Sequence, residues 1–346
     1  MHYKWMLPAV FILSLLVSCM DTTEIPEKGV SQELAQTRKS LLSDIHYQLS
    51  LDIPDSLSQP IEGREKISFH LSRPVRQLVL DFDVPSSHLQ QVKIDGQSAS
   101  YQHINEHILI AGEDLQQGPN DLELTFTAGD LSLNRNEDYL YSLFVPDRAS
   151  TAFPCFDQPN LKATFQLDLK IPKPWTAVTN GPVKTKRDTA RHTLLSFQET
   201  RPISTYLFAF VAGDFKKISR TRNGTTLHMY HKETDTARVN KNIGKIFDLH
   251  FNALEWLEAY TGISYPFRKF AFVVVPSFQY SGMEHPGATY YRDSRVFLDE
   301  SATIRDKLNR ANLISHETAH MWFGDLVTME WFDQVWLKEV YANFMA

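Results

Sequence analysis

Hydrophobic and polar residues alternate along several short runs in the first two thirds of the chain. The clearest runs are 46–51, 66–71, 121–126, 163–171 and 206–211. A period of two is typical of strands with one buried face, and clusters of Pro, Gly and Asn separate these runs. Asn223-Gly224 then predicts a type I′ hairpin turn. We therefore predict an all-β N-terminal domain over residues 43–225, with largely antiparallel strands.

After Thr236 the hydrophobic period changes to that of a helix. Apolar residues recur every three or four positions on one face, and Gly262 stands where a C-terminal cap is expected. A buried strand follows at 270–275, and two further helical patterns are expected. The apolar face of the first helix comprises Ile243, Phe247, Phe251 and Leu254, and the later helical patterns cover 304–322 and 331–344. The alternation of helix and strand predicts a mixed α+β domain over residues 226–346.

The N-terminus has a different pattern. Lys4 precedes an apolar run over 7–17, which ends in Ser18-Cys19. This run is short for a membrane span and has the layout of a secretory signal. Because Leu16-Val17-Ser18-Cys19 resembles a lipobox, we predict a lipoprotein signal peptide over 1–19 and acylation of Cys19. A plain signal peptide or a membrane anchor is the alternative.

Residues 20–42 follow that signal and read as a polar tether, because they show no sustained periodicity and include Pro26 and Gly29. The predicted location is therefore the bacterial cell envelope, with the protein anchored to the membrane through Cys19. With Cys19 acylated, only Cys155 keeps a free thiol, so no internal disulfide is expected and stability must come from packing.

The composition supports a globular protein and argues against nucleic acid as a partner. The 346 residues are 42% hydrophobic, and the formal net charge is -6. An acidic balance gives no general attraction to phosphate backbones.

His316-Glu317-Thr318-Ala319-His320 is the segment that indicates chemistry. Two histidines four positions apart lie on one helical face, where they can bind a single cation. Glu317 points in a different direction, so its carboxylate is free to act on a water molecule. We therefore predict a metal centre in which Glu317 is the catalytic base.

The third predicted ligand is Glu339, which follows His320 after eighteen intervening residues. A helix-turn-helix could return this carboxylate to the histidines. Two His and one Glu leave a fourth position of Zn²⁺ open for water, which is the catalytic arrangement. Bound to zinc, the water would have its pKa lowered from about 16 to about 7, within reach of Glu317 at neutral pH. One Zn²⁺ per chain is therefore expected.

In these segments the chain strongly resembles the M1 family of zinc aminopeptidases, which are gluzincins. The zinc signature here reads HETAHMWFGDLVTMEWFDQVWLKE. Gly282-Met283-Glu284-His285-Pro286 resembles the family's exopeptidase motif, GxMEN, and FPCFDQP with KATF near residue 160 resembles its β-domain signature. The resemblance extends from about residue 43 to the end of the chain.

The resemblance implies a saddle-like β domain followed by a thermolysin-like catalytic domain. It also implies an aminopeptidase that releases N-terminal residues from peptides. Gly282, Met283 and Glu284 would bind the substrate, and the Glu284 carboxylate would hold the free α-amine. A fixed carboxylate near the metal would restrict cleavage to the first peptide bond. Cys155 is interpreted as a buried structural thiol.

Several positions depart from the family pattern. His285 stands in place of the usual asparagine, Lys338 and Val340 replace the common asparagine and glycine, and Leu143 and Val145 replace glutamine and glutamate. The last two leave substrate preference open, whereas the changes around the last zinc ligand look tolerable.

The family's oxyanion-stabilising tyrosine is not recognised in this sequence, because Tyr341 is too close to Glu339 to serve. The 346 residues are therefore expected to be part of a longer protein. Two alternatives stay open at this point: a related zinc hydrolase acting on another electrophile such as an epoxide, and a non-catalytic peptide-binding or scaffold lipoprotein.

Overall fold

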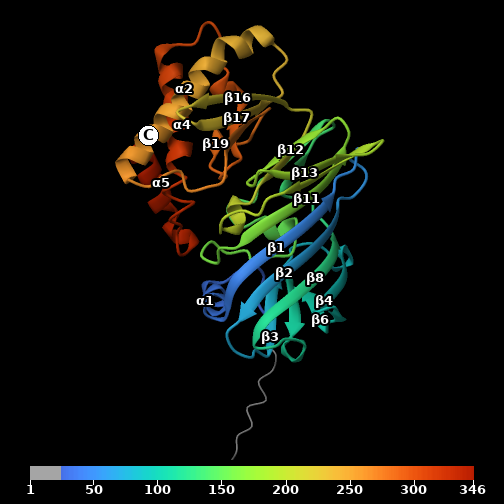
Figure 1. The fold of residues 1–346 in the computed structure, drawn as a ribbon. Helices are drawn as coiled ribbons and strands as arrows, with labels where there is room; N and C mark the ends of the chain where they lie inside the picture. Colours follow the sequence, from blue (N-terminus) through green and yellow to red (C-terminus); the bar gives the residue numbers. More distant parts are fainter. Residues whose placement is uncertain (1–24) are drawn as a thin grey trace, which may run out of the picture.

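The computed structural model describes residues 25–346, and Figure 1 shows a β-rich N-terminal part followed by a part in which helices cover a smaller sheet. The predicted lipidation residue Cys19 and the predicted signal peptide lie outside the described residues. Within 25–346, no helix combines the length and the apolar character needed to cross a membrane.

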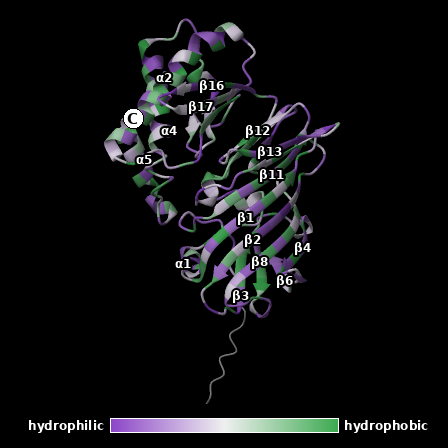
Figure 2. Ribbon diagram, in the orientation of Figure 1, coloured by the Kyte–Doolittle hydropathy of each residue, from purple (hydrophilic) through white to green (hydrophobic). Residues whose placement is uncertain are grey.

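An eight-stranded sheet forms the largest layer of the N-terminal part. Its strands follow the order β13 (Val183–Asp188), β14 (His192–Phe197), β11 (Thr164–Pro172), β1 (Leu42–Asp52), β2 (Glu62–Leu71), β8 (Gly118–Thr127), β4 (Leu89–Ile94) and β5 (Gln97–Ser98). Hydrophobic and hydrophilic residues alternate along these strands (Figure 2), as the period of two predicts. One pair departs from the antiparallel expectation, because β1 and β11 are parallel.

Two smaller sheets complete this part. One contains β12 (Thr176–Thr179), β15 (Phe210–Gly213), β10 (Tyr139–Ser142) and β9 (Leu133–Arg135), and the other contains β3 (Gln77–Asp81), β7 (His107–Ala111) and β6 (Tyr101–Ile104). Short 3₁₀ helices of this part lie at Ser86–His88, Gly112–Asp114, Ala149–Thr151 and Thr205–Leu207, and a fifth, Phe332–Gln334, lies near the C-terminal end of the chain. The run predicted at 206–211 is therefore partly a 3₁₀ turn. Cys155 is fully buried in this core, in agreement with the structural role predicted for it.

The second part is built on a five-stranded sheet in the order β16 (Lys216–Arg222), β17 (Thr225–His231), β18 (Phe270–Val275), β20 (Thr289–Arg292) and β19 (Gly282–Met283). Asn223 and Gly224 both have positive φ between β16 and β17, which confirms the predicted type I′ turn. The predicted boundary at 225 divides this hairpin. Because both strands of the hairpin belong to the five-stranded sheet of the second part, the structure moves the boundary between the two parts to the end of β15.

The helices of the second part are α2 (Thr236–Thr261), α3 (Asp293–Val296), α4 (Ile304–Ala319) and α5 (Val335–Met345). α2 begins at the Asp235 cap and ends at Gly262, whose left-handed φ of 68° confirms the predicted C-terminal cap. Alternate residues of β18 face the helices and the N-terminal core, so this strand is buried on both sides. That arrangement explains its continuous apolar sequence.

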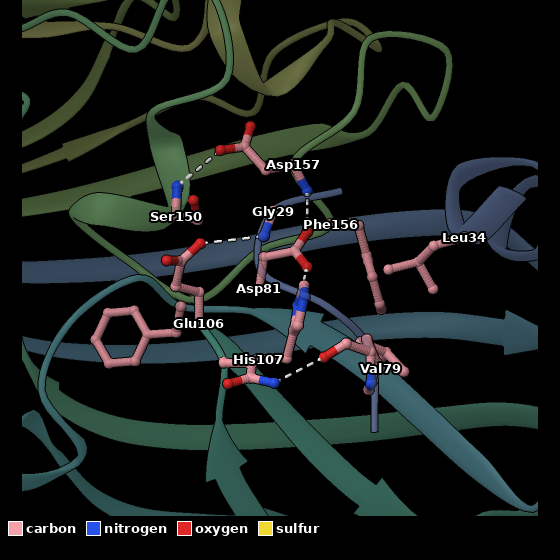
Figure 3. A network of polar contacts seen from close by, with 12 residues as sticks. Gly29, Leu34, Val79, Asp81, Glu106, His107, Ser150, Phe156 and Asp157 are labelled. Atoms are coloured by element: carbon pink, nitrogen blue, oxygen red, sulfur yellow. Dashed lines mark hydrogen bonds and ion pairs between the residues drawn. The ribbon is translucent and has the colours of Figure 1, made fainter. Parts of the chain in front are cut away.

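The predicted tether over 20–42 is wrong for the part that the structure describes. Residues Gln32–Leu41 form helix α1, which begins at the Ser31 cap. Arg38 on α1 is buried and donates through both terminal nitrogens to the carboxylate of Asp81. Figure 3 shows Asp81 in this network, where it also accepts from His107 and from the main-chain nitrogen of Asp157. Sequence periodicity missed α1 because its three buried residues, Ala35, Arg38 and Leu41, include a charged and a small side chain and so give a weak apolar face.

Candidate metal centre

Helix α4 places His316 and His320 on one face. Its start is fixed by a capping box, in which the Thr303 side chain and the Asp306 side chain each bind the other's backbone nitrogen. With one helical turn between them, the two histidines bring their Nε2 atoms to 3.0 Å from each other. Two imidazole nitrogens that face each other at this distance can both direct lone pairs at one cation.

The loop after α4 sets the tautomer of His320. The Nδ1 of this buried side chain lies 3.0 Å from the carbonyl oxygen of Phe323. Because a carbonyl can only accept, Nδ1 carries the proton and the neutral ring keeps a lone pair on Nε2. Such an orienting hydrogen bond is typical of metal-binding histidines.

Helix α5 returns Glu339 to the same point. Its two carboxylate oxygens lie 3.5 Å from the Nε2 of His316 and 3.7 Å from the Nε2 of His320. The structure thus brings together all three predicted ligands from two helices. Two imidazole nitrogens and a carboxylate oxygen form a donor set that suits Zn²⁺, and the residues present fit that metal.

Glu317 lies beside this donor set, with a carboxylate oxygen within 4.8 Å of ligand atoms of both histidines. Burial raises the pKa of Glu317 well above its ordinary value, and the negative charges of Glu284 and Glu339 add to the effect. A cation bound next to it would oppose that shift. The position agrees with a carboxylate that acts on a group held at the metal.

Of the three residues predicted to bind substrate, Gly282 and Met283 form strand β19 and Glu284 follows it directly. Gly282 packs directly against the Glu317 side chain, Met283 is buried in the core, and Glu284 is buried beside His320 and Glu339. The structure therefore places the predicted amine-binding carboxylate next to the candidate metal ligands.

A cavity of about 610 Å³ joins these groups. It is lined by residues of β19, α4 and α5, among them Gly282, Glu284, Glu317 and Glu339. Val145 also lines it, whereas Leu143 is packed in the core of the N-terminal part. Of these two departures from the family pattern, Val145 is thus the one that faces the cavity.

The sequence interpretation underestimated Lys338. Its side chain is buried, and its Nζ forms an ion pair with an oxygen of Glu284. The pKa of Lys338 is raised, because the negative charge of Glu284 outweighs the opposing effect of burial. The helical spacing could have indicated that Lys338 is buried, because Lys338 and Ala342 are four positions apart and share the buried face of α5.

Asp325 is a second residue that the sequence interpretation did not single out. It is fully buried, and neither carboxylate oxygen has a hydrogen-bond partner among the described residues. Burial raises its pKa well above the ordinary value, and the charge of Glu284 raises it further. The main-chain nitrogen of Asp325 donates to the carbonyl of His320, and this hydrogen bond holds the loop after α4 against the proposed ligand.

Two family models match the chain in the order of its two parts. The Peptidase M1 N-terminal domain matches residues 43–207, and the Peptidase family M1 domain matches residues 246–346. These matches agree with a β-rich N-terminal domain followed by a catalytic-domain region.

Curated relatives carry the same family's names. Aminopeptidase N of Streptomyces lividans is 30% identical over 336 residues, covering 92% of this chain and 38% of that protein. Probable aminopeptidase 1 of Sulfurisphaera tokodaii is 30% identical over 309 residues, covering 87% of this chain and 37% of the relative. Mouse endoplasmic reticulum aminopeptidase 1 is 38% identical over 205 residues, which cover 58% of this chain and 22% of its own length. The chain thus spans less than two fifths of the length of these relatives.

Proposed function

Because the chain belongs to peptidase family M1, we propose that it is a zinc-dependent aminopeptidase that releases N-terminal residues from peptides. The observation that carries the proposal is the convergence of His316, His320 and Glu339 on a cavity that Glu317 and Glu284 also line. Peptides with a free N-terminus are the proposed substrates.

His316, His320 and Glu339 would hold one Zn²⁺, which would supply Lewis-acid activation of water and of the scissile carbonyl. Glu317 would take the proton of the attacking water and later pass a proton to the leaving amine. Its burial, and the close packing of Gly282 against it, keep that carboxylate in one place. Glu284 would hold the substrate's α-ammonium, so only the first peptide bond would reach the attacking water.

We further propose that residues 1–19 are a lipoprotein signal and that Cys19 is the lipidated residue, placing the protein at the bacterial cell envelope. The support is the sequence pattern alone. Metabolic labelling with a fatty-acid analogue tests this, because Cys19→Ser would abolish the label if the assignment is right. Label retained by that variant would exclude Cys19.

Glu317→Gln tests the catalytic assignment. The variant keeps all three proposed ligands, so zinc content should stay near one per chain, while kcat on an aminoacyl amide reporter falls by about 10²-fold to 10⁴-fold. Glu123→Gln, an exposed carboxylate on β8, is the matched control. Normal turnover by zinc-loaded Glu317→Gln would show that another group is the base. Bound zinc with no hydrolysis of any reporter by the unmodified protein would favour a peptide-binding role.

A further inference from the structure

Lys338 and Glu284 meet in the interior of the molecule. Lys338 comes from α5 and Glu284 from the segment after β19, and their side chains are only 6% and 5% exposed. A buried ion pair of this kind persists only when both charges are well placed, because each has lost its hydration. The contact is therefore a built feature of the site.

The Lys338 ammonium has two further neighbours. Its Nζ lies 5.0 Å from the ring centroid of Tyr206, in a cation–π geometry, and 3.5 Å from an oxygen of Glu339. The ammonium thus has a carboxylate, an aromatic face and a candidate metal ligand around it. Lys338, Glu284 and Glu339 all line the same cavity.

A buried carboxylate that is already paired with one ammonium group attracts a second ammonium group only weakly. Two ammonium groups on the same carboxylate oxygen would repel each other, and burial strengthens that repulsion. A ligand with a positively charged amine must therefore displace Lys338 before it can pair with Glu284. Separating Lys338 from Glu284 costs free energy, and this cost lowers the ligand's apparent affinity.

We propose that Lys338 is an internal competitor for the ammonium site on Glu284 and thereby determines the specificity of this cavity. The inference rests on the proposed function in one respect, the assignment of Glu284 as the group that faces the substrate's amino end. In the unliganded protein the Lys338 ammonium occupies that carboxylate, so pairing with Glu284 adds less to the affinity of a free amine than an unpaired carboxylate would. The family asparagine that Lys338 replaces carries no charge and could not compete in this way.

Binding of two peptide amides that differ only at the N-terminus tests this proposal. The probes are Leu-Gly-Gly amide with a free amine and its N-acetylated form, and Kd is measured by ligand-observed NMR, which reaches millimolar values. The protein is made metal-free with a chelator, so that no probe is hydrolysed. This readout depends neither on zinc nor on turnover, and a failure of the proposed peptidase activity would show separately in the Glu317→Gln experiment.

For the unmodified protein, we expect the two Kd values to lie within about tenfold of each other. For Lys338→Met, the free-amine probe should bind about tenfold or more tightly than it binds to the unmodified protein, while the acetylated probe changes less. Lys245→Met, an exposed lysine of α2, is the control and should change neither value.

A preference of the unmodified protein for the free amine by more than tenfold overturns the proposal. So does a folded Lys338→Met variant whose affinity for the free amine rises by less than tenfold. Circular dichroism establishes that the variant is folded, and if it is not, the comparison of the two probes on the unmodified protein decides alone.

Discussion

Gly282 lies directly against the carboxyl end of Glu317. A Cβ built on Gly282 would overlap Oε1 of Glu317 and would lie 2.6 Å from its Cδ and 2.7 Å from its Cγ. Edge strand β19 therefore lies so close to the Glu317 side chain that any side chain at position 282 would have to displace the carboxylate. The motif at 282–284 thus begins with glycine because the proposed base, Glu317, fills the space that a side chain at position 282 would need.

Gly282→Ala should displace the Glu317 carboxylate while leaving the metal ligands in place. We expect activity to fall by about a hundredfold, because small displacements of a reacting group have effects of that size. Zinc content should stay unchanged. Gly244→Ala on α2 is the matched control, since Gly244 is exposed and a Cβ there meets nothing within 4 Å. The control should keep activity and gain about 1 kcal/mol of stability from helix propensity. Full activity in Gly282→Ala would contradict the packing argument.

Removal of one proposed ligand should remove the metal. We expect His320→Ala to retain less than about a tenth of the zinc of the unmodified protein, because its ring contributes one of three donors and is oriented by Phe323. Elemental analysis of dialysed protein gives the metal-to-chain ratio. His70→Ala, an exposed histidine on β2, should bind zinc normally. Zinc retained in full by His320→Ala would place the metal elsewhere.

The buried pair between Arg38 and Asp81 should contribute strongly to the stability of the N-terminal part. Arg38→Met leaves the Asp81 carboxylate buried without its main partner, so the free energy of unfolding should fall by about 3–5 kcal/mol. Urea unfolding followed by tryptophan fluorescence measures the change. The double variant Arg38→Met/Asp81→Asn removes both charges and should recover part of the loss. A loss below about 1 kcal/mol in the single variant would mean that α1 is not held by this pair.

Asp157 should make the stability of the folded protein depend on pH. Burial raises its pKa to about 6, although the carboxylate accepts hydrogen bonds from the Ser150 backbone nitrogen and from the Thr205 hydroxyl. Because the folded-state pKa lies above the unfolded value near 4, the folded protein binds the proton more tightly. The Asp157 contribution should therefore stabilise the protein as the pH falls from about 7 to about 4.

Asp157→Asn isolates this effect. The difference in free energy of unfolding between the unmodified protein and the variant should shift in favour of the unmodified protein as the pH is lowered from 7 to 4.5. The shift should be about 2 kcal/mol, since one pKa unit corresponds to about 1.4 kcal/mol and the unfolded carboxyl is still mostly ionised at pH 4.5. Parallel stability curves over that range would show that Asp157 titrates as an ordinary carboxyl.

Local patterns predicted the elements well where one face is apolar and the other polar. The strand at Phe270–Val275 and the helix from Thr236 to its Gly262 cap were both predicted within a residue. Hydrophobic periodicity identifies such elements because it records which side chains are buried. Helix α1 was missed for the same reason, since the charged Arg38 is one of its few buried side chains.

The sequence by itself determined which residues form the candidate site: the His316–His320 pair, Glu317 between them, and Glu339 eighteen intervening residues after His320. Helical geometry alone places the two histidines on one face, and the motif spacing carries the rest. The tertiary structure decided which groups surround them. Whether Lys338 is merely a tolerable change or the partner of Glu284 depends on how α5 lies against the segment after β19. Contacts between segments so distant in sequence leave no local pattern to read.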